Sequence, residues 1–196
     1  PWAPAPSGIV SLRDGSTFYL PAATVGLLVF MVVVTVVFSL LISAYATRMA
    51  FEDWRPAPQL GLLWLNTGVL VLSSLALHRA QRAARQGLMR EAWFGLQLGA
   101  VSALVFLVGQ LLAWRQLVEE GYLVSANPAN AFFYLLTAVH GVHLLGGLAA
   151  LGRTALRAWR GRLTTERLRL SIELCALYWH FLLLVWLVLF ALLLIT

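Results

Sequence analysis

The feature that most constrains this chain is a series of five apolar runs, each of about the length that crosses a lipid bilayer. An α-helix rises about 1.5 Å per residue, so roughly 20 apolar residues span a hydrocarbon core of about 30 Å. The sequence therefore predicts an all-α fold, an integral membrane bundle of five transmembrane helices. The helices are expected at about 22–46, 60–78, 93–116, 131–152 and 172–195.

The composition agrees with this architecture. Of the 196 residues, 61% are hydrophobic and 11% are charged, whereas about a quarter of the residues of an average soluble domain are charged. Residues 1–21, which include several prolines, are expected to form an N-terminal arm, and residues 22–196 the transmembrane domain. These lengths leave no room for a separate water-soluble domain within the sequence.

The net charge of +6 depends on arginine alone, because the chain has no lysine. Most of the arginines fall at 79–90 and 153–169, in loops that share a side with the N-terminal arm when five helices cross the membrane. Basic loops are retained on the cytoplasmic side. We therefore expect a cytoplasmic N-terminus and an external C-terminus. The same interpretation accounts for the basic charge without a nucleic-acid partner.

Four ionisable side chains lie inside the apolar runs, where such a group is costly and needs a partner or a role. They are His140, His143, Glu173 and His180. His143 and His180 fall at a similar depth on antiparallel helices, so they could hold a haem iron axially, as in a small haem-binding membrane cytochrome. Alternatively, neutral imidazoles tie the last two helices together by hydrogen bonds. The bulky residues around them favour this second interpretation, on which His180→Ala weakens the contact between those two helices.

Two interpretations of Glu173 remain open. It lies either in the first turn of the last helix, near water and favoured by the helix dipole, or in a functional role. A transporter is disfavoured, because the first three runs have no charged residue in their interiors. In the third run, Gly95 and Gly99, followed by Ala103, place small residues on one face, which predicts close approach of another helix.

The arginine clusters can also bind lipid. The planar guanidinium fork suits a phosphate group, so Arg79, Arg82, Arg157 or Arg160 is expected to hold the phosphate of an anionic phospholipid. Replacing Arg157 and Arg160 with glutamine should then reduce the anionic phospholipid that the protein retains.

Three segments resemble, in this order and at this spacing, subunit III of the haem–copper cytochrome c and quinol oxidases. They are LNTGVLVLSSLALHRA (65–80), FYLLTAVHGVHLLGG (133–147) and ELCALYWHFLLLVWLVLF (173–190). The resemblance covers about residues 22–196 and indicates the shorter, five-helix bacterial form. The matching positions are Asn66, Thr67, His78, Gln110, His140, Gly141, His143, Glu173, Tyr178, Trp179, His180, Phe181 and Trp186.

The resemblance implies an accessory subunit of an oxidoreductase complex in aerobic respiration. In that family subunit III carries no haem or copper, which belong to partner subunits. It packs against the catalytic subunit I beside other oxidase subunits, and it holds phospholipid in a cleft. The implied location is the bacterial plasma (inner) membrane, and an accessory subunit of nitric oxide reductase is the alternative within the family. We expect no catalytic, cofactor or metal residue, and a structural or lipid-binding role for Asn66, His78, Arg79, His140, His143, Arg157, Arg160, Glu173, Trp179 and His180.

The chain departs from the family pattern by lacking three intramembrane acids. The corresponding positions lie near Val34, at Ala113 and at Leu183. A role in proton uptake that depends on those carboxylates is therefore not expected, and a structural, lipid-holding role gains weight.

Overall fold

The computed structural model describes residues 21–51, 54, 61–125, 127–160 and 165–195. Over these residues the chain is all-helical, and each of its five helices is long and apolar enough to cross a membrane. The predicted fold class is thus confirmed, whereas the predicted N-terminal arm lies outside the described residues apart from Pro21. The helices are α1 (Ala22–Arg48), α2 (Gly61–Arg85), α3 (Met89–Glu119), α4 (Pro128–Trp159) and α5 (Thr165–Ile195).

The helices extend beyond the apolar runs from which they were predicted, most of all where arginines flank the runs. α2 continues to Arg85 instead of ending at 78, and α5 begins at Thr165 instead of at 172. Arginine is a good helix former, and nothing requires a helix to end where the hydrocarbon layer ends. An apolar run therefore marks the membrane-embedded part of a helix and not its full length.

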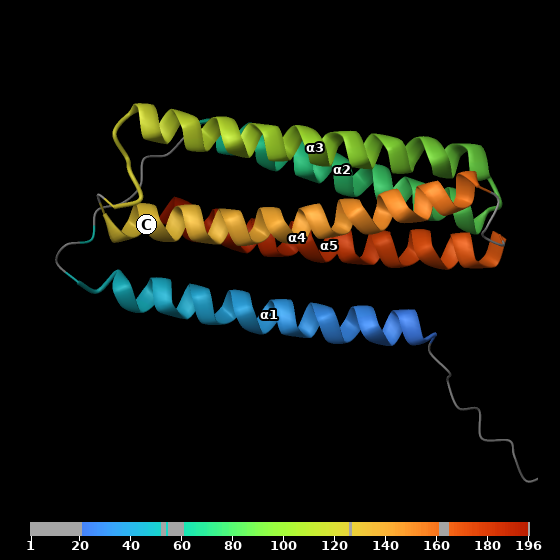
Figure 1. Cartoon of the computed structure of the whole chain (residues 1–196), viewed down its shortest axis with the longest axis horizontal. Coiled ribbons are helices and arrows are strands. Elements are labelled where there is room, and N and C mark those ends of the chain that lie inside the picture. Colours follow the sequence, from blue (N-terminus) through green and yellow to red (C-terminus); the bar gives the residue numbers. More distant parts are fainter. Residues whose placement is uncertain (1–20, 52–53, 55–60, 126, 161–164, 196) are drawn as a thin grey trace, which may run out of the picture.

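Four helices form a closed bundle, and the fifth lies outside it. α2 packs on α3, α3 on α4, α4 on α5 and α5 back on α2, with the α2–α3 contact the most extensive. α1 packs only against α4 and α5 within the described part of the chain. Figure 1 shows α1 on the side of α4 and α5 that faces away from the α2–α3 pair.

The close approach of α2 and α3 depends on glycine. A Cβ atom at Gly95 would lie 2.8 Å from Cβ of Ala80 and 2.9 Å from the carbonyl oxygen of Ala76. A Cβ atom at Gly99 would lie 2.8 Å from Cγ of Leu77. The contact predicted from these two glycines is confirmed, and its partner is α2.

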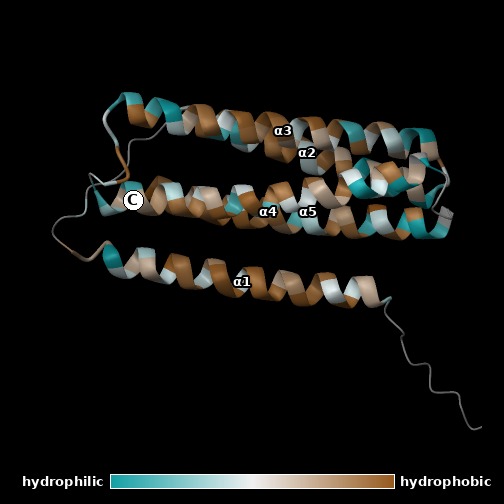
Figure 2. Ribbon diagram, in the orientation of Figure 1, coloured by the Kyte–Doolittle hydropathy of each residue, from teal (hydrophilic) through white to brown (hydrophobic). Residues whose placement is uncertain are grey.

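Hydropathy along the bundle follows the pattern of a membrane protein. Figure 2 shows apolar residues over the middle of the helices and polar residues gathered toward their ends. Many valines and leucines remain exposed on the outer faces, among them Val32 on α1, Leu72 on α2 and Val142 on α4. Such surfaces suit a hydrocarbon solvent, in which exposed apolar side chains carry no penalty.

Candidate functional site

His140 occupies the centre of the molecule. Its side chain on α4 is fully buried, with ring centroids 5.1 Å from Trp186 of α5, 5.8 Å from Phe106 of α3 and 6.5 Å from Phe38 of α1. Neither ring nitrogen has a hydrogen-bond partner among the described residues. His140 therefore contributes aromatic packing between four helices, and no hydrogen bond from it ties α4 to α5.

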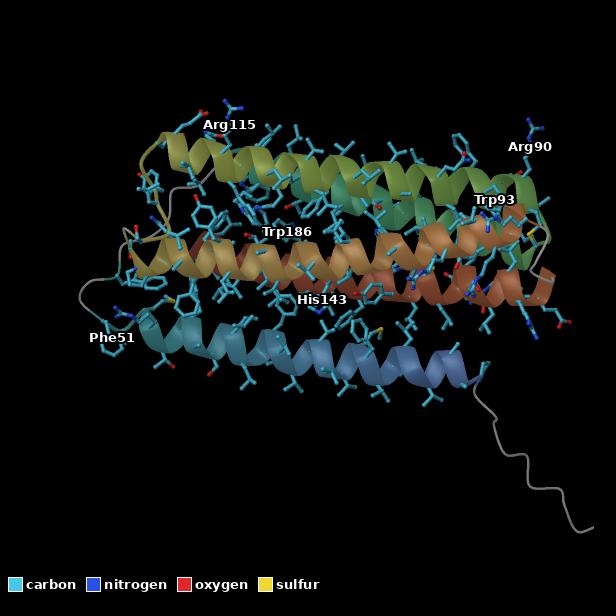
Figure 3. The ribbon with its side chains drawn as sticks, in the orientation of Figure 1. Phe51, Arg90, Trp93, Arg115, His143 and Trp186 are labelled. Carbon is cyan, nitrogen blue, oxygen red and sulfur yellow. The ribbon has the colours of Figure 1, made fainter. Side chains whose placement is uncertain are left out.

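Two buried tryptophans of α5 attach that helix to α2. Nε1–H of Trp186 donates to Oγ1 of Thr67 at 3.0 Å, and Nε1–H of Trp179 donates to Oγ of Ser73 at 2.9 Å. The Ser73 hydroxyl in turn donates to the carbonyl oxygen of Gly99 on α3 at 2.7 Å. Each indole thus satisfies its donor in the interior, and one chain of hydrogen bonds runs from α5 through α2 to α3. Figure 3 shows Trp186 on the side of α5 that faces the α2–α3 pair.

Asn66 and Gln110 place two amides in the interior between α2 and α3. Their side chains are 1% and 4% exposed, and none of their amide atoms has a hydrogen-bond partner in the described ranges. The Asn66 amide fills the space above Gly109, where an added Cβ would lie only 2.0 Å from Oδ1. A glycine is therefore required at position 109 as long as Asn66 keeps this conformation.

His143 faces α1. Its ring lies 5.6 Å from Phe38 and 6.1 Å from Phe30, centroid to centroid, and Nδ1 lies 2.7 Å from the carbonyl oxygen of Val139, to which it donates. The backbone carbonyl of His143 accepts from the hydroxyl of Tyr178 on α5 at 3.0 Å. The α4–α5 hydrogen bond at this level therefore comes from a tyrosine, a donor that the sequence interpretation did not assign. Figure 3 shows His143 between α4 and α1.

His180 faces α2, which corrects the expectation that it contacts α4. Its side chain is exposed on the bundle surface, and its ring centroid lies 5.6 Å from that of His78. His180 also hydrogen bonds through Nδ1 to the carbonyl oxygen of Ala176 in its own helix. Because α5 packs on both α2 and α4, depth along the helix cannot tell which neighbour a given side chain meets.

The structure does not place His143 and His180 as a facing pair. One ring packs on α1 and the other on α2, so the two imidazoles that could have held a haem iron axially are directed to different neighbours. Within the described ranges, no three His, Cys, Asp or Glu side chains gather as a metal-binding group.

Glu173 joins α5 to α2 through an ion pair. Its Oε1 lies 2.9 Å from Nε of Arg85 and 3.4 Å from Nε of Arg169. Of the two interpretations left open for Glu173, the one that placed it in the first turn of its helix is wrong, because α5 begins at Thr165. All three side chains are partly exposed, so the pair contributes at most about 1 kcal/mol.

The arginines predicted to bind lipid lie at one end of the bundle. Arg79 and Arg82 of α2, Arg157 of α4 and Arg160 just after α4 all have exposed side chains. They share this end because α2 and α4 run in the same direction and both end there (Figure 1).

A cavity of about 560 Å³ opens between α1, α4 and α5. Its lining is almost entirely apolar and includes Leu27 and Phe30 of α1, together with His143, Gly147 and Tyr178. Gly147 lets α4 approach α5 closely beside the cavity, because a Cβ atom there would lie 2.9 Å from the Tyr178 ring. The cavity has the character of a site for an apolar chain and not for a polar substrate.

Apolar residues lie at or near the three positions where the acids of the resembling family were expected to be missing. Val34 and Ala113 are 1% and 0% exposed, and Leu183 is half-buried against the core. Val34 belongs to a cluster with Phe38 and Leu136 at the junction of α1, α4 and α5. The packing at each of these positions therefore accommodates an apolar side chain.

Several residues that connect the helices were not singled out from the sequence. Ser73 and Gly109 are two of them. Trp114 and Thr137 are two more: Nε1–H of Trp114 donates to Oγ1 of Thr137 at 3.1 Å, which joins α3 to α4. The available signal was the presence of small hydroxyl residues within apolar runs, since such residues supply hydrogen bonds between membrane helices. That signal does not identify the partner.

Comparison with known proteins places the chain in one family. The profile of cytochrome c oxidase subunit III matches residues 22–195, a range that includes all five helices. Cytochrome c oxidase subunit 3 of Synechocystis sp. is 35% identical over 179 residues, which cover 85% of this chain and 72% of that protein. The protein of the same name from Thermostichus vulcanus is 30% identical over 176 residues, 86% of this chain and 84% of that protein. The chain, a multi-pass membrane protein by its five apolar helices, belongs to the cytochrome c oxidase subunit III family.

Proposed function

We propose that this chain is the accessory subunit III of a haem–copper terminal oxidase, and that it stabilises the catalytic subunit I and holds structural phospholipid. The observation that carries the proposal is the family match across the five helices. The shared positions His140, Trp179 and Trp186 lie at the centre of the bundle, where they serve packing and interhelical hydrogen bonds. On this proposal haem and copper belong to the partner subunits, and this chain contributes no redox centre.

The α2–α5 face is the surface we propose for subunit I. His180 lies at the midpoint of α5, and both it and His78 reach the outside of the bundle instead of its interior. Ionisable residues at membrane depth rarely face lipid; they face protein or a polar cavity. A partner with hydrogen-bonding groups at this level would satisfy both imidazoles.

The cavity between α1, α4 and α5 is the place we propose for a phospholipid acyl chain. It is apolar, of about 560 Å³, and it opens toward the outside of the bundle. Arg157 and Arg160 extend from the end of α4, one of the helices that line the cavity. Their guanidinium groups would be available for the phosphate of an anionic lipid.

The orientation that we propose places the arginine-rich end in the cytoplasm of a bacterium, with the helices in its plasma membrane. α2 and α4 end there, and α3 and α5 begin there. Arg79, Arg82, Arg90 and Arg153 all lie toward this end. Basic residues next to membrane helices are retained on the cytoplasmic side.

Purification in mild detergent through a tag on this chain tests the proposed function. We expect a many-helix haem-bearing subunit to co-purify, and the haem absorbance to vanish once the chain is separated from it. His180→Ala should lower the yield of this partner and leave the helicity and melting of the separated chain unchanged. Glu120→Ala, at the end of the bundle away from the arginine clusters and outside the α2–α5 face, is the control.

Three outcomes would contradict the proposal. A chain that purifies without a partner but with haem of its own would make it a membrane cytochrome. A chain that purifies without a partner and without haem absorbance would contradict its membership in an oxidase complex. A partner that lacks oxidase activity and reduces nitric oxide would favour the alternative accessory role.

A further inference from the structure

A second groove lies on the opposite side of the molecule, on the outer face of α2 and α3. Its volume is about 680 Å³. Small residues form its floor, namely Ala76 and Ala83 of α2 and Gly95 of α3. Because Gly95 lets the two helices approach closely, the larger side chains on either side stand above the line of contact. Among the residues that the structure describes, the groove shares no lining residue with the cavity between α1, α4 and α5.

The walls of the groove are apolar and exposed. Leu72 and Leu75 of α2 are 61% and 54% exposed, and Phe94 and Leu98 of α3 are 69% and 47% exposed. A surface of this kind faces either lipid or an apolar partner.

The two ends of the groove differ in chemistry. One end carries Arg90 and Glu91, Arg79 lies further along the groove, beside the level at which Ala80 packs against Gly95, and the other end lies near Ser102. Ser102 lies twelve positions after Arg90 on α3, which corresponds to about 18 Å along the helix. This length is close to one leaflet, about half of a hydrocarbon core of ~30 Å.

The groove also lies at the depth of one leaflet. α3 has 31 residues, so it is longer than the hydrocarbon core is thick, and its midpoint falls close to Ser102. Arg90 is the second residue of the helix and belongs to the headgroup layer. Arg79 lies deeper, because its neighbour Ala80 packs against Gly95, and arginine side chains at that depth extend toward the interface.

The two arginines are available for a ligand. Arg85, Arg115 and Arg169 each pair with a carboxylate, whereas Arg79 and Arg90 make no ion pair with any described residue and both are exposed. With Glu91 as the single acid among the described lining residues, the part of the groove toward the start of α3 keeps a net positive charge. Figure 3 shows Arg90 extending away from the bundle at that end of α3.

We propose that the α2–α3 groove binds one anionic phospholipid of the leaflet at the arginine-rich end. Its phosphate lies between Arg79 and Arg90, and an acyl chain lies along the groove toward Ser102. A guanidinium group binds phosphate through paired hydrogen bonds, and one net negative charge on the lipid balances the charge of the site. An apolar helix in the groove would instead leave both guanidinium groups without a partner. The inference rests on the proposed function in one respect: it assigns a particular site to the lipid-holding role proposed there.

Native mass spectrometry of the complex purified through this chain tests the inference. The complex is incorporated in nanodiscs of phosphatidylcholine with a small fraction of phosphatidylglycerol, and the lipids retained after dilution into detergent are counted. We expect wild type to retain one phosphatidylglycerol more than the double variant R79Q/R90Q. The apparent affinity of that lipid should fall roughly tenfold in the variant.

Three further variants identify the site. E91Q should strengthen retention, because it removes the one carboxylate found among the groove's described lining residues. S102F should weaken retention without any change of charge, because it fills the end that receives the acyl chain. R115Q is the matched control at the far end of α3, where the arginine pairs with Glu119, and it should retain lipid as wild type does.

The inference is overturned if R79Q/R90Q retains as much phosphatidylglycerol as wild type, or if R115Q loses as much as the double variant. It is also overturned if wild type retains phosphatidylcholine equally well, or if R79Q/R90Q loses a protein subunit instead of a lipid. Retention of the haem subunit is read from the same spectra. If the complex keeps the haem subunit but R79Q/R90Q retains phosphatidylglycerol as wild type does, only the inference is refuted. If the chain purifies without the haem subunit, the proposed function is refuted.

Discussion

Single small residues determine how the helices of this protein meet. Gly95 and Gly99 allow α3 to contact α2 along its backbone, and Gly109 accommodates the amide of Asn66. A membrane offers no hydrophobic driving force between apolar helices, so packing contacts and hydrogen bonds hold them together. One added methyl group at such a position therefore changes the spacing of two helices.

Gly95→Ala should destabilise the bundle by roughly 1–3 kcal/mol, because the added Cβ would overlap Ala80 and the carbonyl oxygen of Ala76. Thermal unfolding of the detergent-solubilised chain, followed by circular dichroism, measures the effect as a lower Tm. Gly68→Ala is the control, since nothing lies within 4 Å of its added Cβ. The packing argument fails if the two variants melt at the same temperature.

At the scale of the elements, two of the short connections use the same glycine turn. After α2 the amides of Gly87 and Leu88 donate to the carbonyl oxygens of Ala84 and Ala83. After α3 the amide of Gly121 donates to the carbonyl oxygen of Val118 in the same way. The φ angles of the two glycines are 79° and 86°, a left-handed conformation that closes a helix and that glycine adopts readily.

Gly87→Val should lower the stability of the α2–α3 pair by about 1 kcal/mol or more, because a β-branched residue resists a positive φ. Gly87→Asn should cost less, since asparagine tolerates this conformation. Nothing lies within 4 Å of a Cβ at this position, so the comparison of Tm values isolates backbone strain from packing. Equal Tm values for the two variants would show that the turn does not limit stability.

At the scale of the whole molecule, the uneven placement of arginine gives the bundle two different ends. The turn after α2 belongs to the arginine-rich end, and the turn after α3 to the opposite end. The proposed orientation therefore assigns Gln86 to the cytoplasm and Glu120 to the outside. Both side chains are exposed, so both are suitable for labelling.

Labelling of intact cells tests that orientation. In a Cys175→Ser background, which removes the single cysteine, Glu120→Cys should react with a membrane-impermeant maleimide and Gln86→Cys should not. Gln86→Cys should react once the cells are opened. The reverse pattern in intact cells would invert the proposed topology.

The amount that could be predicted from the sequence differs between the residues of the site. His140, His143, Glu173 and His180 were recognised because ionisable groups stand out in an apolar run. Their partners were not recognised. His180 contacts His78 on α2, and the hydrogen bond between α4 and α5 is donated by Tyr178. Spacing along one helix defines a face of that helix, but it contains no information about which helix packs there.

The sequence alone determined that this protein has five membrane helices, which face of α3 carries small residues, and where the charged residues of the chain fall. Length and hydropathy suffice for these properties because each is local to one segment. Only the tertiary structure decided that α2 pairs with α3, that α1 lies outside the bundle, and that Glu173 binds Arg85. In lipid the buried and exposed faces of a helix are both apolar, so hydrophobicity does not separate core from surface. The shape of the packed side chains and the hydrogen bonds between helices decide which face is buried. Both depend on residues brought together from different helices.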